Sequence, residues 1–195
     1  MKRFWIGLAT GLAAAVIVPL LILATGAVNF AATAGPSSIE KTLAQFAVRR
    51  SIAQRVPDEQ NPLEDKQQAI ESGGHHYADT CLSCHGAPGV APKEFAKGLN
   101  PPAPDLVDSL QRLNDAELFW ITKNGIRMTG MPALGPTHTD NDIWRIVAFV
   151  RHLPNLTEDE KEKLKKSLGE GHQHESSVHG AGSSDDHHDH GDHAH

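Results

Sequence analysis

Five consecutive residues carry the clearest chemical signal in the chain: Cys81-Leu82-Ser83-Cys84-His85. This C-x-x-C-H spacing is the attachment signature of a c-type haem. The two thiols add across the two vinyl groups of one porphyrin, so they must lie one helical turn apart. The next residue then places an imidazole beneath the iron. We therefore predict one haem, bound covalently by Cys81 and Cys84, with His85 as an axial ligand of the iron.

Other uses of a closely spaced cysteine pair fit the sequence less well. A thioredoxin-like redox pair needs a βαβ context, and the chain has no strand pattern. A four-cysteine zinc site needs a second cysteine pair, but the chain has only two cysteines. A structural disulfide between Cys81 and Cys84 can form in an oxidising compartment, although it would close a very small loop.

The second axial ligand is expected downstream of this motif, where Met128, Met131 and His138 are the candidates. Met131 lies between a glycine and a proline, in a loop between two expected helices, and these neighbours restrict its backbone. Methionine ligation raises the reduction potential, whereas His138 would give a bis-histidine site of lower potential. We expect Met131 to be the second axial ligand.

Three motifs follow one another between about residues 65 and 155. They are Gly73-x-x-x-Tyr77-x-x-x-Cys81-x-x-Cys84-His85, the segment 124–133 around Met131, and the segment 144–154. In this order they resemble the N-terminal haem helix, the methionine-ligand loop and the C-terminal helix of class I c-type cytochromes.

This resemblance implies an all-α, small cytochrome c fold, with three to four short helices around one haem. Its N- and C-terminal helices would cross at the haem edge, with Gly73 and Tyr77 against Trp144 and Ala148. It also implies that a proline carbonyl after the haem motif accepts the ring N–H of the proximal histidine. Several prolines compete for this role, Pro101 and Pro102 among them.

The chain starts with Met1-Lys2-Arg3, and residues 4–28 are uncharged and mostly apolar. This run is long enough to span a bilayer as a helix. The basic start places the N-terminus in the cytoplasm, which puts the haem domain on the periplasmic side of the inner membrane. A cleaved signal peptide ending at Ala32-Thr33-Ala34 is the alternative. We expect an anchor, because the run exceeds the usual h-region of about 7–15 residues.

Helical periodicity and capping residues predict the other elements. We expect helices over residues 37–56, 64–84, 115–124, 139–154 and 157–168, and loops over 86–105 and 126–137. Ile39, Leu43, Phe46 and Ala47 share one face of the first of these helices. That helix is either a simple connector or a helix lying on the membrane surface. The helix over 157–168 carries charges of both signs, so we expect it to be solvated.

The chain therefore divides into five parts. These are a transmembrane anchor (1–30), a connector helix and linker (31–64), a cytochrome c domain (65–155), a charged helix (156–170) and a disordered tail (171–195). The tail is low in apolar residues and holds eight histidines: His172, His174, His179, His187, His188, His190, His193 and His195. Imidazole suits zinc, copper and nickel, so the tail is a candidate metal-binding segment.

Composition and ligation together point to an electron carrier rather than an enzyme. A net charge of −6 argues against a nucleic-acid-binding protein. Axial ligation by both His85 and Met131 leaves no open iron position, which favours one-electron transfer to a redox partner. That partner would be a terminal oxidase, a quinol-oxidising complex or a periplasmic dehydrogenase. The alternatives are a metal-handling protein that works through its tail, and a peroxidase-like enzyme in which Met131 dissociates.

Overall fold

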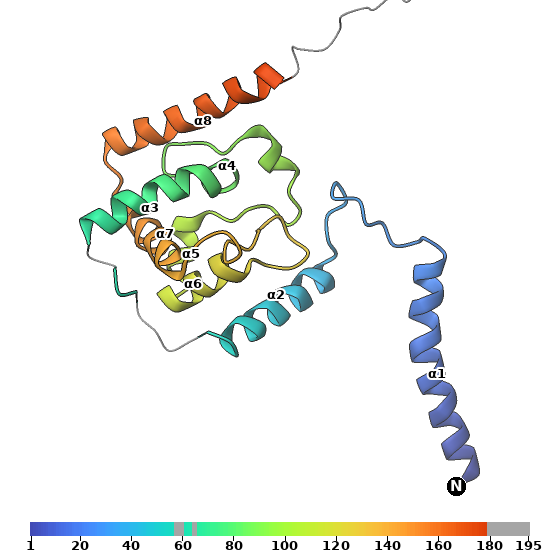
Figure 1. Ribbon diagram of the computed structural model, residues 1–195. Coiled ribbons are helices and arrows are strands. Elements are labelled where there is room, and N and C mark those ends of the chain that lie inside the picture. The colour runs from blue at the N-terminus through green and yellow to red at the C-terminus, as the bar shows by residue number, and fades with distance from the viewer. Residues whose placement is uncertain (57–60, 64–65, 179–195) are drawn as a thin grey trace, which may run out of the picture. The chain divides into compact units, whose positions relative to one another are not determined.

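The computed structural model describes residues 1–56, 61–63 and 66–178, with residues 170–178 described by their backbone alone (Figure 1). Every regular element in these ranges is helical, which confirms the predicted all-α class. The elements are α1 (Lys2–Ala24), α2 (Ser38–Ala53), α3 (Gln67–Thr80), α4 (Leu82–His85), α5 (Leu106–Leu110), α6 (Asp115–Asn124), α7 (Asp140–His152), α8 (Glu158–Val178) and two 3₁₀ turns, η1 (Glu94–Gly98) and η2 (Leu153–Asn155). The chain forms two compact units, residues 1–46 and 47–195.

The first unit contains α1 and most of α2. None of the residues of α1 is buried, and its length and apolar composition suffice for a membrane span. A signal sequence near an N-terminus meets the same two criteria. The helix α2 begins where the sequence predicts, because the Oγ atom of Ser37 accepts a hydrogen bond from the backbone N–H of Glu40 at 3.2 Å.

The second unit is built on the crossing of α3 and α7, which make the most extensive helix–helix contact in the described chain. The nearest neighbours of Gly73 are the Arg145 carbonyl and the Phe149 side chain. The Tyr77 and Phe149 rings lie 5.2 Å apart. We expected Trp144 and Ala148 against Gly73 and Tyr77; the nearest contacts found here come from Arg145 and Phe149, one residue further along α7. Trp144 instead stacks on Phe119 of α6, with ring centroids 4.2 Å apart.

Local capping decides where the helices of this unit begin and end. Asn114 and Glu117 form a capping box at the start of α6, and Thr139 and Asp142 form another at the start of α7. The predicted bounds of α6 are confirmed. The predicted helix over 64–84 is shorter and is interrupted at Cys81, which separates α3 from α4. The short helix α5 was not predicted, although the Asp105 carboxylate accepts backbone hydrogen bonds at its N-terminus.

The charged helix α8 is not simply solvated. Leu164 is only 5% exposed and belongs to the core, with Leu168 packed against it. The two leucines are four residues apart, so they form an apolar edge on an otherwise charged helix. This helix contacts α3 and α4, as Figure 1 shows. It also continues to Val178, past the expected end at residue 168.

Candidate functional site

The single turn α4 holds two of the predicted site residues, Cys84 and His85, and a third, Cys81, is its N-cap. Cys81 lies at the junction of α3 and α4 and is buried, while Cys84 and His85 are half-buried. Both cysteines are free thiols, so the structural disulfide considered for this pair is absent. Burial raises the pKa of the Cys81 thiol to about 11. Redox-active cysteines have lowered thiol pKa values, so this environment also argues against a thioredoxin-like pair.

The imidazole of His85 is oriented by a backbone carbonyl. Its Nδ1 atom lies 2.9 Å from the carbonyl oxygen of Pro104. A carbonyl oxygen only accepts hydrogen bonds, so Nδ1 must carry the proton and donate it, which assigns the tautomer. The Nε2 atom then has its lone pair free for a metal. The sequence left this acceptor open and put Pro101 and Pro102 forward, whereas the structure identifies Pro104.

The backbone after His85 is held in place by a buried tyrosine. The Tyr77 side chain is fully buried, and its hydroxyl donates to the Gly86 carbonyl at 2.5 Å. Burial also raises the pKa of this phenol far above its usual value. Gly86 has a φ of +63°, and a Cβ there would lie 2.6 Å from the carbonyl oxygen of Val90. The loop is therefore tied to α3 and tightly turned. A cavity of about 250 Å³ lies beside this loop and the His85 ring.

The loop that carries Met131 is closed by hydrogen bonds within itself, directly after α6. The Ile126 N–H donates to the Met131 carbonyl at 3.2 Å, and the Met131 N–H donates to the Thr129 hydroxyl at 3.1 Å. Gly125 has a φ of +65°, and a Cβ there would lie 2.8 Å from the Met131 carbonyl oxygen. A side chain at this position would push the loop away from α6. The backbone of Met131 is thus held on both sides.

The three candidates for the second axial ligand lie in different environments. Met131 is half-buried. Met128 is 87% exposed and has a φ of +60°, so it lies on the surface of the loop. His138 lies beside His76 of α3, with the two rings 5.3 Å apart, and its Nδ1 atom is 2.9 Å from the Thr137 hydroxyl. Ligation by Met131 stays a prediction.

The predicted metal site of the tail stays a prediction too. Residues 179–195, which contain six of the eight tail histidines, lie outside the described residues. His172 and His174 lie within α8. Within the part of the chain that the structure describes, no group of three or more His, Cys, Asp or Glu side chains is placed to hold a metal ion.

The helix crossing and the His85 turn lie within a stretch that matches a known family. Residues 68–150 match the family model of cytochrome C oxidase, cbb3-type, subunit III. This stretch is a class I c-type cytochrome domain. No curated protein matches the chain. The cytochrome domain carries haem c and transfers electrons, and its family indicates a partner in a redox or oxidase complex.

The residues of the cytochrome domain fit haem c. Two free thiols lie within one helical turn, and the adjacent His85 has its Nε2 atom available. When bound, haem c supplies an iron centre that cycles between the ferric and ferrous states. The protein supplies the attachment points, the orientation of His85 and the burial around them.

Proposed function

We propose that this protein is a membrane-tethered electron carrier with one haem c, in which His85 and Met131 are the two axial ligands. The observation that carries the proposal is the 2.9 Å hydrogen bond between the His85 ring and the Pro104 carbonyl. It holds the imidazole in the tautomer and orientation that an iron ligand needs. A cysteine pair used for thiol chemistry has no need of this arrangement.

Two ligand segments held by the backbone favour electron transfer over bond-making chemistry. His85 is anchored through Pro104, and Gly86 is bound by Tyr77. The backbone of Met131 is held by hydrogen bonds to Ile126 and Thr129 of its own loop. With both axial positions filled, the iron has no open position at which a substrate could bind. Because both ligand segments are held in place, the ligands move little when the iron changes its charge. The methionine sulfur favours the ferrous state and raises the reduction potential.

The helix α1 supports a tether in the cytoplasmic membrane. It is long and apolar enough to span a bilayer, and Lys2 and Arg3 favour a cytoplasmic N-terminus. The cytochrome domain then lies on the periplasmic side. The description of the matching family names an oxidase subunit. We therefore favour a terminal oxidase as the partner, ahead of a quinol-oxidising complex or a periplasmic dehydrogenase. Electrons would pass in a small, transient contact.

Spectroscopy and redox titration of the purified holoprotein test the proposal. We expect haem that survives denaturation, a low-spin spectrum and a reversible one-electron titration. The double variant C81A/C84A should lose the haem on denaturation. High-spin iron in the wild-type protein would favour the peroxidase-like alternative, and haem retained by the denatured double variant would overturn covalent attachment.

Cell fractionation tests the tether separately. The intact chain should stay in the membrane fraction after high-salt and carbonate washes. A mature N-terminus at Gly35, measured by mass spectrometry, would show that the apolar segment is a cleaved signal peptide.

A further inference from the structure

The helix α2 has an apolar stripe of exposed side chains. Ile39, Leu43 and Phe46 are 81%, 65% and 62% exposed. Their spacing of four and three residues places them on one side of the helix. Ile52 of α2 is buried and Val48 is partly buried. These two side chains lie on a different side of the helix. The stripe is therefore a second apolar surface of this helix.

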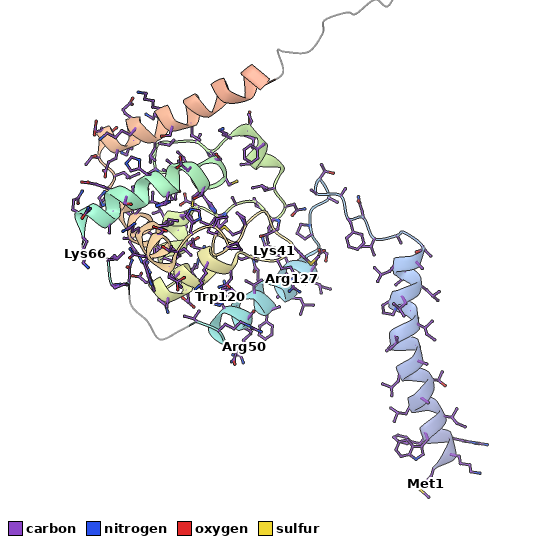
Figure 2. All side chains as sticks on the ribbon, in the orientation of Figure 1. Met1, Lys41, Arg50, Lys66, Trp120 and Arg127 are labelled. Carbon is purple, nitrogen blue, oxygen red and sulfur yellow. The ribbon has the colours of Figure 1, made fainter. Side chains whose placement is uncertain are left out.

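Basic side chains accompany this stripe. Arg50 follows Phe46 by four residues and extends the same side, and Arg49 flanks it. Within the described residues, neither arginine forms an ion pair with an acidic side chain, and Glu40 is the only acid in α2. Figure 2 labels Arg50 on this helix. A local basic surface in a chain with a net charge of −6 favours an anionic partner.

The position of α2 in the chain indicates which anionic partner it meets. Thirteen residues separate the end of α1 at Ala24 from the start of α2 at Ser38. Even fully extended, this connection spans only about 45 Å. It contains Phe30, which is 80% exposed and is of the apolar kind found at membrane interfaces. A lipid surface is thus within reach of α2 whenever α1 spans a bilayer.

We propose that α2 lies on an anionic phospholipid surface. Ile39, Leu43 and Phe46 enter the boundary between headgroups and acyl chains, and Arg49 and Arg50 bind lipid phosphates. Arginine suits this role because its planar guanidinium binds phosphate with two parallel hydrogen bonds. The inference rests on the proposed membrane anchor, and α2 gives the chain a second, reversible attachment to the same membrane.

Single-cysteine variants of the full-length holoprotein test this proposal. The native cysteines form the haem thioethers, so an introduced thiol is the reactive one. We would place cysteine at Leu43 or Phe46 (L43C, F46C), and at Gln45 as the matched control (Q45C), because Gln45 is exposed on another side of α2. Each variant is reconstituted in nanodiscs of phosphatidylcholine alone or mixed with phosphatidylglycerol. Its reaction with a water-soluble maleimide is then timed.

The proposal predicts that L43C and F46C react several-fold more slowly than Q45C in the mixed lipid, and that the difference shrinks in phosphatidylcholine alone. The added substitutions R49Q and R50Q should speed the reaction of L43C in the mixed lipid. Equal rates at residues 43 and 45 in both lipids would overturn the proposal, as would protection that is unaffected by lipid charge. Failure of the chain to remain with the nanodisc would instead show that the anchor itself is wrong.

Discussion

Gly73 of α3 lies directly against the backbone carbonyl of Arg145 in α7, and a Cβ atom at Gly73 would overlap with that oxygen. The Cβ of Phe149 would lie 3.0 Å from the same added atom. The two helices therefore meet backbone to backbone at this point. Because α3 leads into the turn that carries Cys81, Cys84 and His85, this close approach sets where the haem attachment turn lies on the core.

Replacing Gly73 with alanine should destabilise the cytochrome domain by about 3 kcal/mol, because the helices must separate to admit the methyl group. Chemical denaturation followed by circular dichroism and haem absorbance measures the free energy of unfolding. The matched control is G98A, since a Cβ at Gly98 meets no atom within 4 Å. An unchanged stability of G73A would contradict the close approach.

Replacing Met131 with alanine should abolish the weak far-red absorbance band of iron–sulfur ligation and lower the reduction potential. We expect a shift on the order of 0.1 V, within the span of about 0.8 V that axial ligands cover. The control M128A should leave both readouts unchanged, because Met128 is 87% exposed. If M128A, or a variant of His138, removes the band instead, the choice of ligand is wrong.

Arg151 joins α7 to the end of α5, to the start of α6 and to the loop between them. Its Nε atom lies 2.5 Å from the Asp115 carboxylate, and its two terminal nitrogens donate to the Leu110 and Leu113 carbonyls at 3.1 and 2.8 Å. Replacing it with alanine should cost about 2 kcal/mol of stability, between the values for exposed and buried pairs.

Two further variants separate the hydrogen bonds of Arg151 from its charge. R151K keeps the charge but loses the planar fork, so it should be nearly as unstable as R151A. R112A removes an exposed arginine and should change the stability by less than about 0.5 kcal/mol. Full recovery of stability in R151K would show that charge alone matters.

Asp142 should make stability depend on pH in the acid range. The Thr139 hydroxyl donates to its carboxylate at 2.6 Å, and His76 and Arg145 lie near the same group. These contacts hold the pKa of Asp142 below its ordinary value. A lowered pKa in the folded state means that the stabilisation is present above about pH 4 and is lost as the pH falls through the folded value.

Denaturation of wild-type protein and D142N across pH measures this effect. D142N should be less stable by about 1 kcal/mol at neutral pH, because the capping box at the start of α7 is weakened. The difference should vanish in acid, where the wild-type carboxyl group is protonated. A difference that stays constant down to the lowest pH at which the protein folds would contradict this role of the charge.

Deleting residues 171–195 should remove the binding of zinc and copper, measured by calorimetry on the full-length and shortened holoproteins. We expect weak to moderate binding, because the tail loses chain entropy when it wraps an ion. It should weaken further as the pH falls, since protons compete for the imidazole nitrogens. Equal binding by both proteins, or none by either, would remove the tail from metal chemistry.

Features that depend on neighbouring residues can be predicted from the sequence alone. The haem attachment turn is local, because Cys81, Cys84 and His85 lie within about one helical turn. The helix starts at Asn114 and Thr139 are local too, since each capping box joins residues three apart. The apolar N-terminal segment is likewise visible from composition and length alone.

Contacts between distant segments depend on how the helices and loops pack in the folded chain. The acceptor for His85 lies nineteen residues along the chain, and several prolines of one loop satisfy the same pattern, so the path of that loop selects Pro104. The partners of Gly73 depend on the rotation of α7 about its own axis, which periodicity does not give to within one residue. The burial of Leu164 depends on where α8 packs, because its charges outnumber the two leucines that hold it on the core.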